Sequence, residues 1–229
     1  MTRMLASVAN LAEARLVAEE QADFIDLKNP ELGALGGLDP HTATHIIHTL
    51  KQEFETPCFS ATIGDLPLHP QPVIPAVTAM GKTGADYVKI GFFPDGDLDG
   101  VMKGLRPVLA EGVRLIAVLF GEDPLDLSLI PRLKDVGFSG VMLDTRDKRK
   151  GSLAKRIPTD TLNEFLQTAK KNQLLTGLAG SLTGQEIPVL LSLKPDYLGF
   201  RGALCAGTRT ATLDRERVRL IRHLITTTD

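Results

Sequence analysis

Residues 24–28 read Phe-Ile-Asp-Leu-Lys, a short apolar run that ends in charges and is followed by an amphipathic segment at 40–54. The same unit recurs along the whole chain. The predicted strands lie at 4–8, 24–27, 58–63, 87–90, 115–120, 140–143, 174–178 and 197–200. The predicted helices lie near 10–20, 40–54, 73–83, 97–111, 126–136, 159–171, 184–193 and 214–226. Eight strands that each precede a helix predict a parallel sheet with helical crossovers.

The spacing of these units favours a closed barrel. Each unit averages about 29 residues, close to the minimum for a strand–helix–strand crossover. No linker, low-complexity tract or block of like charges interrupts the series. We therefore predict one α/β domain over residues 1–229, a single (β/α)8 barrel of the TIM type. An open, doubly wound sheet is the alternative.

Helix-end residues agree with these boundaries. Asn10 with Glu13 reads as a capping box at the start of the first helix, and Asp214 is placed to cap the last. Prolines fall where helices are predicted to begin, because a helix start needs no donor from the proline nitrogen. They are Pro40, Pro158 and Pro188.

Composition excludes several classes of protein. The chain has 229 residues, 43% hydrophobic and 24% charged, with a formal net charge of -2 and both signs interspersed. Such a balance does not favour a nucleic-acid partner. No stretch reaches the roughly 18 apolar residues of a membrane span, and the N-terminus lacks a signal-peptide core. Cys58 and Cys205 form no pair motif, which is typical of a reducing compartment. We expect a cytoplasmic protein without membrane partners.

Charged residues occur in strands that a barrel buries. Asp26 and Lys28 share one side of the second strand by alternation, and Lys89 and Asp144 end the fourth and sixth, with Lys148 four residues on. Alternate strands of an eight-stranded barrel fill the same interior layers. We therefore expect Lys28, Lys89 and Asp144 to converge at the carboxyl ends of the strands, with Asp26 one layer below. Asp26–Lys28 and Asp144–Lys148 as structural salt bridges are the alternative.

Such a cluster suggests amine chemistry. Burying ions costs several kcal/mol each, so a site that keeps several lysines usually uses them. Crowding and desolvation lower the pKa of a lysine from about 10.4 towards neutrality. A neutral amine condenses with a carbonyl to give an imine, while a carboxylate and a second lysine move protons.

Small residues after the last two strands suggest an anion site. Gly180 and Ser181 follow the seventh strand, and Arg201 and Gly202 follow the eighth. Barrels often bind phosphate there through backbone N–H groups, and Ser181 and Arg201 could add a hydroxyl and a charge-assisted contact. Tight turns alone would also explain the glycines. A glycine-rich stretch at 29–37 is a candidate mobile cover over the mouth.

Two apparent metal motifs are discounted, and no metal or cofactor is expected. The stretch 95–100 resembles a calcium loop, but Arg106 stands where its twelfth position needs glutamate. A stripe of histidines lies opposite the apolar face of its helix and should point outward, as a solvated surface or a contact in a homo-oligomer. These are His41, His45 and His48.

Several stretches resemble the (5-formylfuran-3-yl)methyl phosphate synthase family, also called 4-(hydroxymethyl)-2-furancarboxaldehyde-phosphate synthase. The resemblance runs in order through nearly the whole chain. Its stretches are 7–10 (SVAN), 22–30 (ADFIDLKNP), 35–36, 60–65 (SATIGD), 85–91 (ADYVKIG), 142–145 (MLDT), 178–181 (LAGS) and 199–205 (GFRGALC). The stretches 149–152 and 206–212 depart from the family pattern.

The resemblance implies an enzyme, a lyase that condenses two molecules of glyceraldehyde 3-phosphate and releases one phosphate and two waters. Its product is the furan precursor of the one-carbon carriers methanofuran and methylofuran. The resemblance makes Lys28 the imine-forming lysine and Lys89 the proton acceptor. Asp26, Asp144 and Lys148 match other active-site positions of the family.

Two other functions fit the same residues. An ordinary class I aldolase acting on a small sugar phosphate would share the imine-forming lysine but release no phosphate. A non-catalytic barrel could bind a phosphorylated metabolite as a sensor and make no product.

Overall fold

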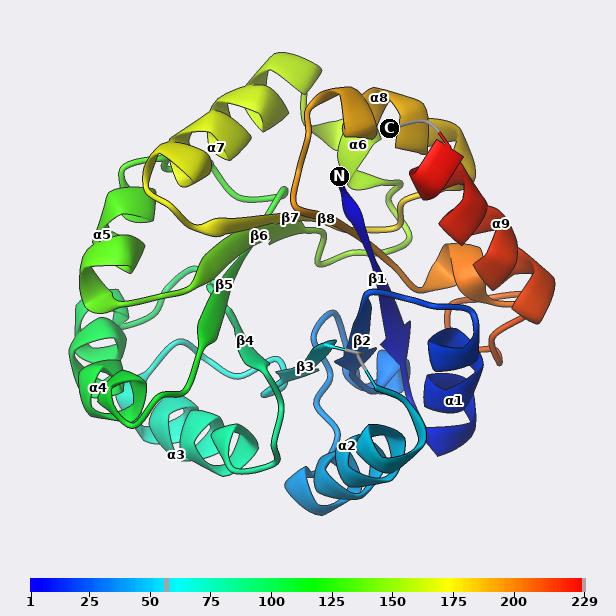
Figure 1. Cartoon of the computed structure of the whole chain (residues 1–229). Helices are drawn as coiled ribbons and strands as arrows, with labels where there is room; N and C mark the ends of the chain where they lie inside the picture. The colour runs from blue at the N-terminus through cyan, green and yellow to red at the C-terminus, as the bar shows by residue number, and fades with distance from the viewer. Residues whose placement is uncertain (56–57, 228–229) are drawn as a thin grey trace.

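Eight parallel strands close into a barrel, and helices form a ring outside it (Figure 1). The computed structural model describes residues 1–55 and 58–227. The strands are β1 Arg3–Val8, β2 Phe24–Leu27, β3 Cys58–Thr62, β4 Tyr87–Gly91, β5 Leu115–Phe120, β6 Gly140–Asp144, β7 Leu175–Leu178 and β8 Tyr197–Phe200. Because β1 pairs with β8 as well as with β2, the sheet has no free edge. The predicted (β/α)8 barrel is confirmed, and the open-sheet alternative is wrong.

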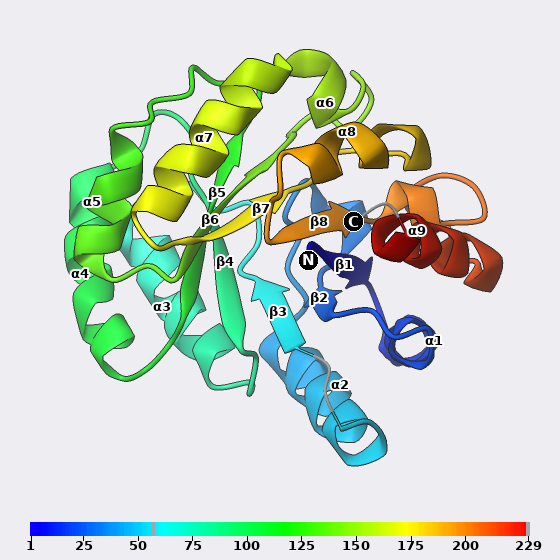
Figure 2. The same ribbon diagram turned by 45° about the horizontal axis from the view of Figure 1, so that its top comes forward.

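The helices follow the predicted series and pack on the outside of the strands, with α9 lying beside α1 and α8 (Figure 2). The longer ones are α1 Leu11–Glu19, α2 Pro40–Glu53, α3 Pro70–Gly81, α4 Leu98–Ala110, α5 Leu129–Val136, α7 Thr159–Lys171, α8 Ile187–Ser192 and α9 Arg215–Thr227. Across residues 1–55 and 58–227, no helix combines the length and apolar character needed to cross a bilayer.

Short helical turns are the elements that the sequence did not predict. They are α6 Leu153–Arg156 and the 3-10 turns η1 Pro30–Leu32 and η3 Gly202–Leu204, whereas the turn η2 Gly184–Glu186 lies within the helix predicted near 184–193. A single turn is too short to show a 3.6-residue period, so hydrophobic patterning cannot reveal it. Helix α3 also begins three residues before the predicted start at 73, because Pro70 already occupies its first turn.

Strand alternation divides the apolar residues into two cores. Along β5, Leu115 and its alternate neighbours face the helices, whereas Ile116 and its alternate neighbours fill the barrel. Phe24 and Tyr197 pack inside the barrel with ring centroids 5.3 Å apart. Gly177 makes room for this packing, since a Cβ there would lie 2.2 Å from the Tyr197 ring. Aromatic side chains thus fill part of the barrel, and polar residues occupy the rest.

The first helix begins as predicted, with one difference in the cap. The Asn10 side chain accepts from the Glu13 backbone N–H at 3.0 Å. The Glu13 carboxylate, however, accepts from Ala9 N–H at 2.8 Å rather than from Asn10. At the far end of the chain, Asp214 caps α9 by accepting from Arg217 N–H at 3.0 Å.

Glu13 also joins the first and last βα units through a buried ion pair. Its carboxylate accepts two hydrogen bonds from the Arg201 guanidinium, at 2.5 Å and 3.1 Å, and both side chains are more than 90% buried. Arg201 further donates to the carbonyl oxygens of Ser7, Arg209 and Ala211 at 3.2, 2.9 and 2.9 Å. These bonds engage all five N–H donors of the guanidinium.

We expect Glu13→Ala to lower the free energy of unfolding by about 3–5 kcal/mol, because it leaves Arg201 buried without a counter-ion. Urea denaturation followed by circular dichroism measures the change. The matched control is Arg15→Ala, which breaks an exposed pair with Glu53 and should cost no more than about 1 kcal/mol. Equal effects of the two substitutions would contradict the assignment.

Candidate active site

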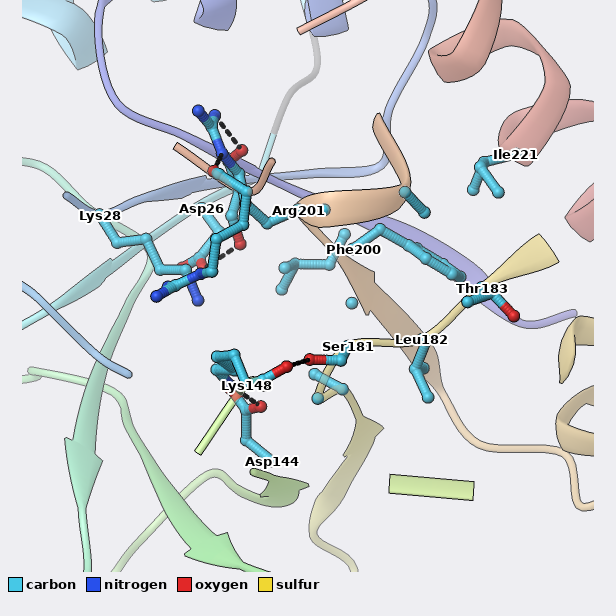
Figure 3. A pocket seen from close by; sticks show the side chains of 18 of the residues that line it. Asp26, Lys28, Asp144, Lys148, Ser181, Leu182, Thr183, Phe200, Arg201 and Ile221 are labelled. Carbon is cyan, nitrogen blue, oxygen red and sulfur yellow. Dashed lines mark hydrogen bonds and ion pairs between the residues drawn. The ribbon is translucent and has the colours of Figure 1, made fainter. Parts of the chain in front are cut away.

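Four charged side chains point into the barrel at the carboxyl end of the strands. Alternation along β2, β4 and β6 sends Asp26, Lys28, Lys89 and Asp144 inward, and each is at least 94% buried. All four line one cavity of about 820 Å³, together with Lys148 (Figure 3). The structure therefore brings together the five residues that the sequence singled out for chemistry.

Asp26 and Lys89 form a buried ion pair at the bottom of this cluster. Lys89 Nζ lies 2.5 Å from Asp26 Oδ1. Two hydroxyls also donate hydrogen bonds to the Asp26 carboxylate, Ser7 Oγ at 3.0 Å and Ser60 Oγ at 2.7 Å. Burial alone would raise the pKa of Asp26, but the charges of Lys89 and Lys28 lower it overall. Asp26 is therefore a carboxylate fixed in one orientation.

Asp144 and Lys148 form a second ion pair on another side of the cavity (Figure 3). Thr145 N–H donates to Asp144 Oδ1 at 2.7 Å. Burial raises the pKa of Asp144, and the nearby charges of Lys148 and Lys28 more than offset it. Glu122, which follows β5, fixes the loop that carries Lys148 by accepting from Arg146 N–H at 3.0 Å and Asp147 N–H at 3.1 Å.

Lys28 differs from the other two lysines in its partners. Its Nζ donates to the Ala34 carbonyl oxygen at 3.4 Å. In the part of the chain that the structure describes, it forms no ion pair with a carboxylate. Burial lowers the pKa of Lys28 to about 8, with Asp144 opposing and Lys148 adding to the effect. Lys28 is therefore more often a neutral amine near neutral pH than an exposed lysine is, and a neutral amine is the form that can act as a nucleophile.

The pairing of charges differs in one respect from the salt-bridge alternative drawn from the sequence. Asp144 does pair with Lys148, but Asp26 of β2 pairs with Lys89 of β4, on the other side of β3, rather than with Lys28 two residues along its own strand. Side chains at i and i+2 of a strand stand side by side and need not meet, whereas inward side chains of alternate strands fill the same layer of the barrel.

Main-chain groups from β7 and β8 line the same cavity. Gly180 has φ +104°, and a Cβ there would lie 2.8 Å from the backbone nitrogen of Thr145. Ser181 also has a positive φ, +50°, and its Oγ donates to the Lys148 carbonyl oxygen at 3.2 Å. Gly202 opens η3, whose first N–H groups have no partner within the turn. Gly180, Ser181 and Gly202 are thus placed where backbone N–H groups can receive an anion.

Arg201 lies at the cavity but does not extend a free guanidinium into it. The sequence suggested a charge-assisted contact between this side chain and phosphate. In the structure its donors bind Glu13 and three carbonyl oxygens instead. The role of Arg201 in the fold is therefore to hold the loop after β8 in place.

The glycine-rich segment 29–37 closes over the interior of the barrel, and Ala34 and Leu35 pack on the inner core. Asp65 anchors the segment by accepting from Ala34 N–H and Leu35 N–H, both at 2.7 Å. Thr62 Oγ1 adds a hydrogen bond to the Gly36 carbonyl oxygen at 3.1 Å. The segment expected as a mobile cover is thus packed on the inner core and tied to β3 and the loop that follows it, and its mobility stays a prediction.

The discounted metal motifs lie away from this cavity. His41, His45 and His48 are exposed on α2, as predicted from the buried face of that helix. Asp97 caps α4 by accepting from Gly100 N–H at 2.9 Å. Within residues 1–55 and 58–227, no group of three or more histidine, cysteine, aspartate or glutamate side chains is arranged to hold a metal ion.

Several residues that build or line the site were not predicted from the sequence. Glu122 and Asp65 act by accepting backbone N–H groups from other loops, and no spacing rule links such partners. Arg209 lines the cavity from the loop after η3, in one of the stretches that depart from the family pattern. Only Asp65, at the end of the 60–65 stretch, lay within a segment already singled out.

The amino-acid sequence is similar to proteins of one family. The model of the 4-HFC-P synthase family matches residues 4–222. A Methylorubrum extorquens protein, named provisionally as a (5-formylfuran-3-yl)methyl phosphate synthase, is 39% identical over 217 residues, covering 94% of this chain and 88% of the relative. The (5-formylfuran-3-yl)methyl phosphate synthase of Archaeoglobus fulgidus is 30% identical over 230 residues, covering 94% of this chain and 96% of the relative.

Solved structures share the fold at much lower identity. The 3-hexulose-6-phosphate synthase of Salmonella typhimurium superposes with a TM-score of 0.70 at 17% identity, covering 100% of both chains. The phosphoribosyl anthranilate isomerase of Thermus thermophilus gives 0.66 at 15% identity, again over 100% of both chains. At these identities the likeness concerns the barrel alone.

We expect the reactivity of Lys28 towards acetic anhydride to rise with pH and to level off above about 8, because the neutral fraction falls about tenfold per unit below the pKa. Asp144 raises the pKa of Lys28 and Lys148 lowers it. Asp144→Asn should therefore move the midpoint to lower pH, and Lys148→Met should move it to higher pH. Mass spectrometry of the Lys28 peptide gives the profile, and a wild-type midpoint near 10.4 would contradict the proposed amine.

Proposed function

This chain belongs to the 4-HFC-P synthase family, and on that basis we propose that it condenses two molecules of glyceraldehyde 3-phosphate into (5-formylfuran-3-yl)methyl phosphate. One phosphate and two waters leave in the reaction. The product would serve methanofuran or methylofuran biosynthesis. The observation that supports the proposal is Lys28, a buried amine without a carboxylate partner among the described residues, in a cavity that Gly180, Ser181 and Gly202 also line.

The first step we propose is capture of one aldehyde by Lys28. Neutral Nζ attacks C1 of the triose phosphate, and loss of water from the carbinolamine gives a protonated imine. The pKa of about 8 keeps enough of Lys28 neutral for the attack. Asp144 and Lys148 lie close enough to affect that pKa, so they are placed to move the protons that water formation requires.

The second step is removal of a proton from the carbon next to the imine. The iminium group accepts the electron pair of the C–H bond, giving an enamine. We assign the proton to Lys89, whose Nζ lies 2.5 Å from Asp26 Oδ1. Lys89 would first give its ammonium proton to the hydroxyl that leaves the carbinolamine as water, so that its amine is neutral when the C–H bond breaks. Asp26, fixed by Ser7 and Ser60, would orient Lys89 and stabilise the ammonium that forms when Lys89 takes the proton. The enamine then has the electron pair needed to attack a second aldehyde or to expel phosphate.

Binding and release of phosphate would fall to the end of the cavity near β7 and β8. Backbone N–H groups around Gly180, Ser181 and Gly202 would hold the phosphate of the substrate linked to Lys28. Neutral N–H donors stabilise an anion without adding a full charge. The segment 29–37, tied to Asp65, would keep water from hydrolysing the imine.

Incubation with glyceraldehyde 3-phosphate alone is expected to yield a furan chromophore and inorganic phosphate in equal amounts, one of each for two triose phosphates consumed. Ultraviolet absorbance and a phosphate assay measure both. A reversible aldol product without phosphate would indicate an ordinary class I aldolase. Binding without any product, in the wild type and in Lys28→Ala alike, would indicate a sensor.

Borohydride added with the substrate is expected to fix an adduct on Lys28, found by peptide mass mapping, and Lys28→Ala should abolish it. Lys89→Met should still form the adduct but lose about 10²–10⁴-fold in turnover, as expected for a general base. The control is Lys103→Met, since Lys103 is exposed on α4 outside the cavity. An adduct on another lysine, or full turnover in Lys89→Met, would refute these assignments.

A further inference from the structure

Arg209 is an arginine of the cavity that the steps above do not use. It lies in the loop between η3 and α9, and Arg201 Nε fixes its backbone by donating to the Arg209 carbonyl oxygen at 2.9 Å. Arg201 is held in turn by Glu13. The backbone of Arg209 is therefore anchored through a buried ion pair to the first βα unit.

The side chain of Arg209 is half-buried and lines the cavity. Its Nη2 donates to the Gly33 carbonyl oxygen at 3.1 Å. Among the described residues this is the one hydrogen bond that its guanidinium makes, and no carboxylate forms an ion pair with it. Burial lowers the pKa of Arg209, with Asp144 opposing. Most of its donors are thus unused by protein groups.

Arg209 and Lys28 approach the same piece of backbone. Lys28 Nζ donates to the carbonyl oxygen of Ala34, and Arg209 donates to that of Gly33, the preceding residue. Gly180 and Ser181, in contrast, follow β7, and Gly202 follows β8. Arg209 Cβ lies 3.8 Å from where a Cβ on Gly202 would stand, and the guanidinium reaches from there to the cover segment that Lys28 also contacts.

The charge of the cavity leaves room for more than one anion. Among the described residues, seven lysine and arginine side chains line it against two carboxylates. Arg201 and Arg149 are matched by Glu13 and Asp147, which lie outside the lining. The remaining cations still exceed Asp26 and Asp144. The excess of three positive charges is larger than one phosphate dianion neutralises, so it also favours a second anion.

We propose that Arg209 binds the phosphate of the second triose phosphate, the one that is not linked to Lys28. The inference rests on the proposed function, which requires two phosphate groups in the cavity at once. The cradle accounts for one of them. A guanidinium with unused donors is suited to bind the other in a bidentate manner, whereas Arg201 has no donor left. Arg217 also borders the cavity, but it is exposed on α9, where water screens its charge.

The test separates capture of the first substrate from binding of the second. Arg209→Ala should form the borohydride-trapped adduct on Lys28 at least as well as the wild type. Its rate of furan formation at low glyceraldehyde 3-phosphate should fall about 10- to 100-fold through a raised KM, the loss expected for charged hydrogen bonds. Arg209→Lys keeps the charge without the bidentate geometry and should recover part of the rate. The control Arg106→Ala, exposed on α4, should match the wild type in both assays.

Equal losses of adduct and product in Arg209→Ala would overturn the inference, as would full activity in that variant. A lowered thermal midpoint without rescue by Arg209→Lys would also overturn it, because the role would then be structural. Equilibrium dialysis against radiolabelled inorganic phosphate gives a readout that needs no turnover. The wild type should bind two phosphates per chain and Arg209→Ala one. Equal stoichiometry would overturn the inference, whereas absence of furan from the wild type would overturn only the proposed function.

Discussion

The site depends on the burial of the Lys28 side chain inside a closed sheet, with no carboxylate paired to it among the described residues. In a closed barrel every second side chain of a strand points inward. The side chains of Asp26, Lys28, Lys89 and Asp144 therefore lie in the same interior and line one cavity. Asp26 neutralises Lys89, and Asp144 neutralises Lys148. Lys28 has no such partner among the described residues, and its pKa falls to about 8. The two ion pairs thus leave one of the three lysines without a carboxylate partner, which is the basis of its proposed role.

These ion pairs also explain how the barrel tolerates so many charges. A buried carboxylate is stable only when its lone pairs are satisfied, and Asp26 achieves this with Lys89, Ser7 and Ser60. Loops that carry the other groups are fixed from neighbouring units, by Glu122 for the loop after β6 and by Asp65 for the cover segment. Carboxylates at the rim of the barrel therefore position the lysines and the cover without entering the cavity.

Periodicity and alternation account for most of what the sequence predicted. All eight strands were placed because apolar runs of four to six residues recur before amphipathic segments. The shared cavity of Lys28, Lys89 and Asp144 followed from the rule that strand side chains alternate. Which side chains pair between different elements did not follow from these rules, so the Asp26–Lys89 and Glu13–Arg201 ion pairs were found only in the structure. Arg209 escaped prediction because its position depends on a loop that has no periodic pattern.

Two phosphates pose an electrostatic difficulty for an imine-forming lysine. Each anion near Lys28 favours the ammonium form and would raise the pKa that burial has lowered. In the proposed function, the backbone cradle would reduce this effect for the first phosphate by keeping it at the β7 and β8 end of the cavity. For a phosphate nearer to Lys28, a permanent cation beside it would offset the charge, and a guanidinium stays charged at working pH. Arg209, which donates to the carbonyl next to the one that Lys28 contacts, would supply that cation.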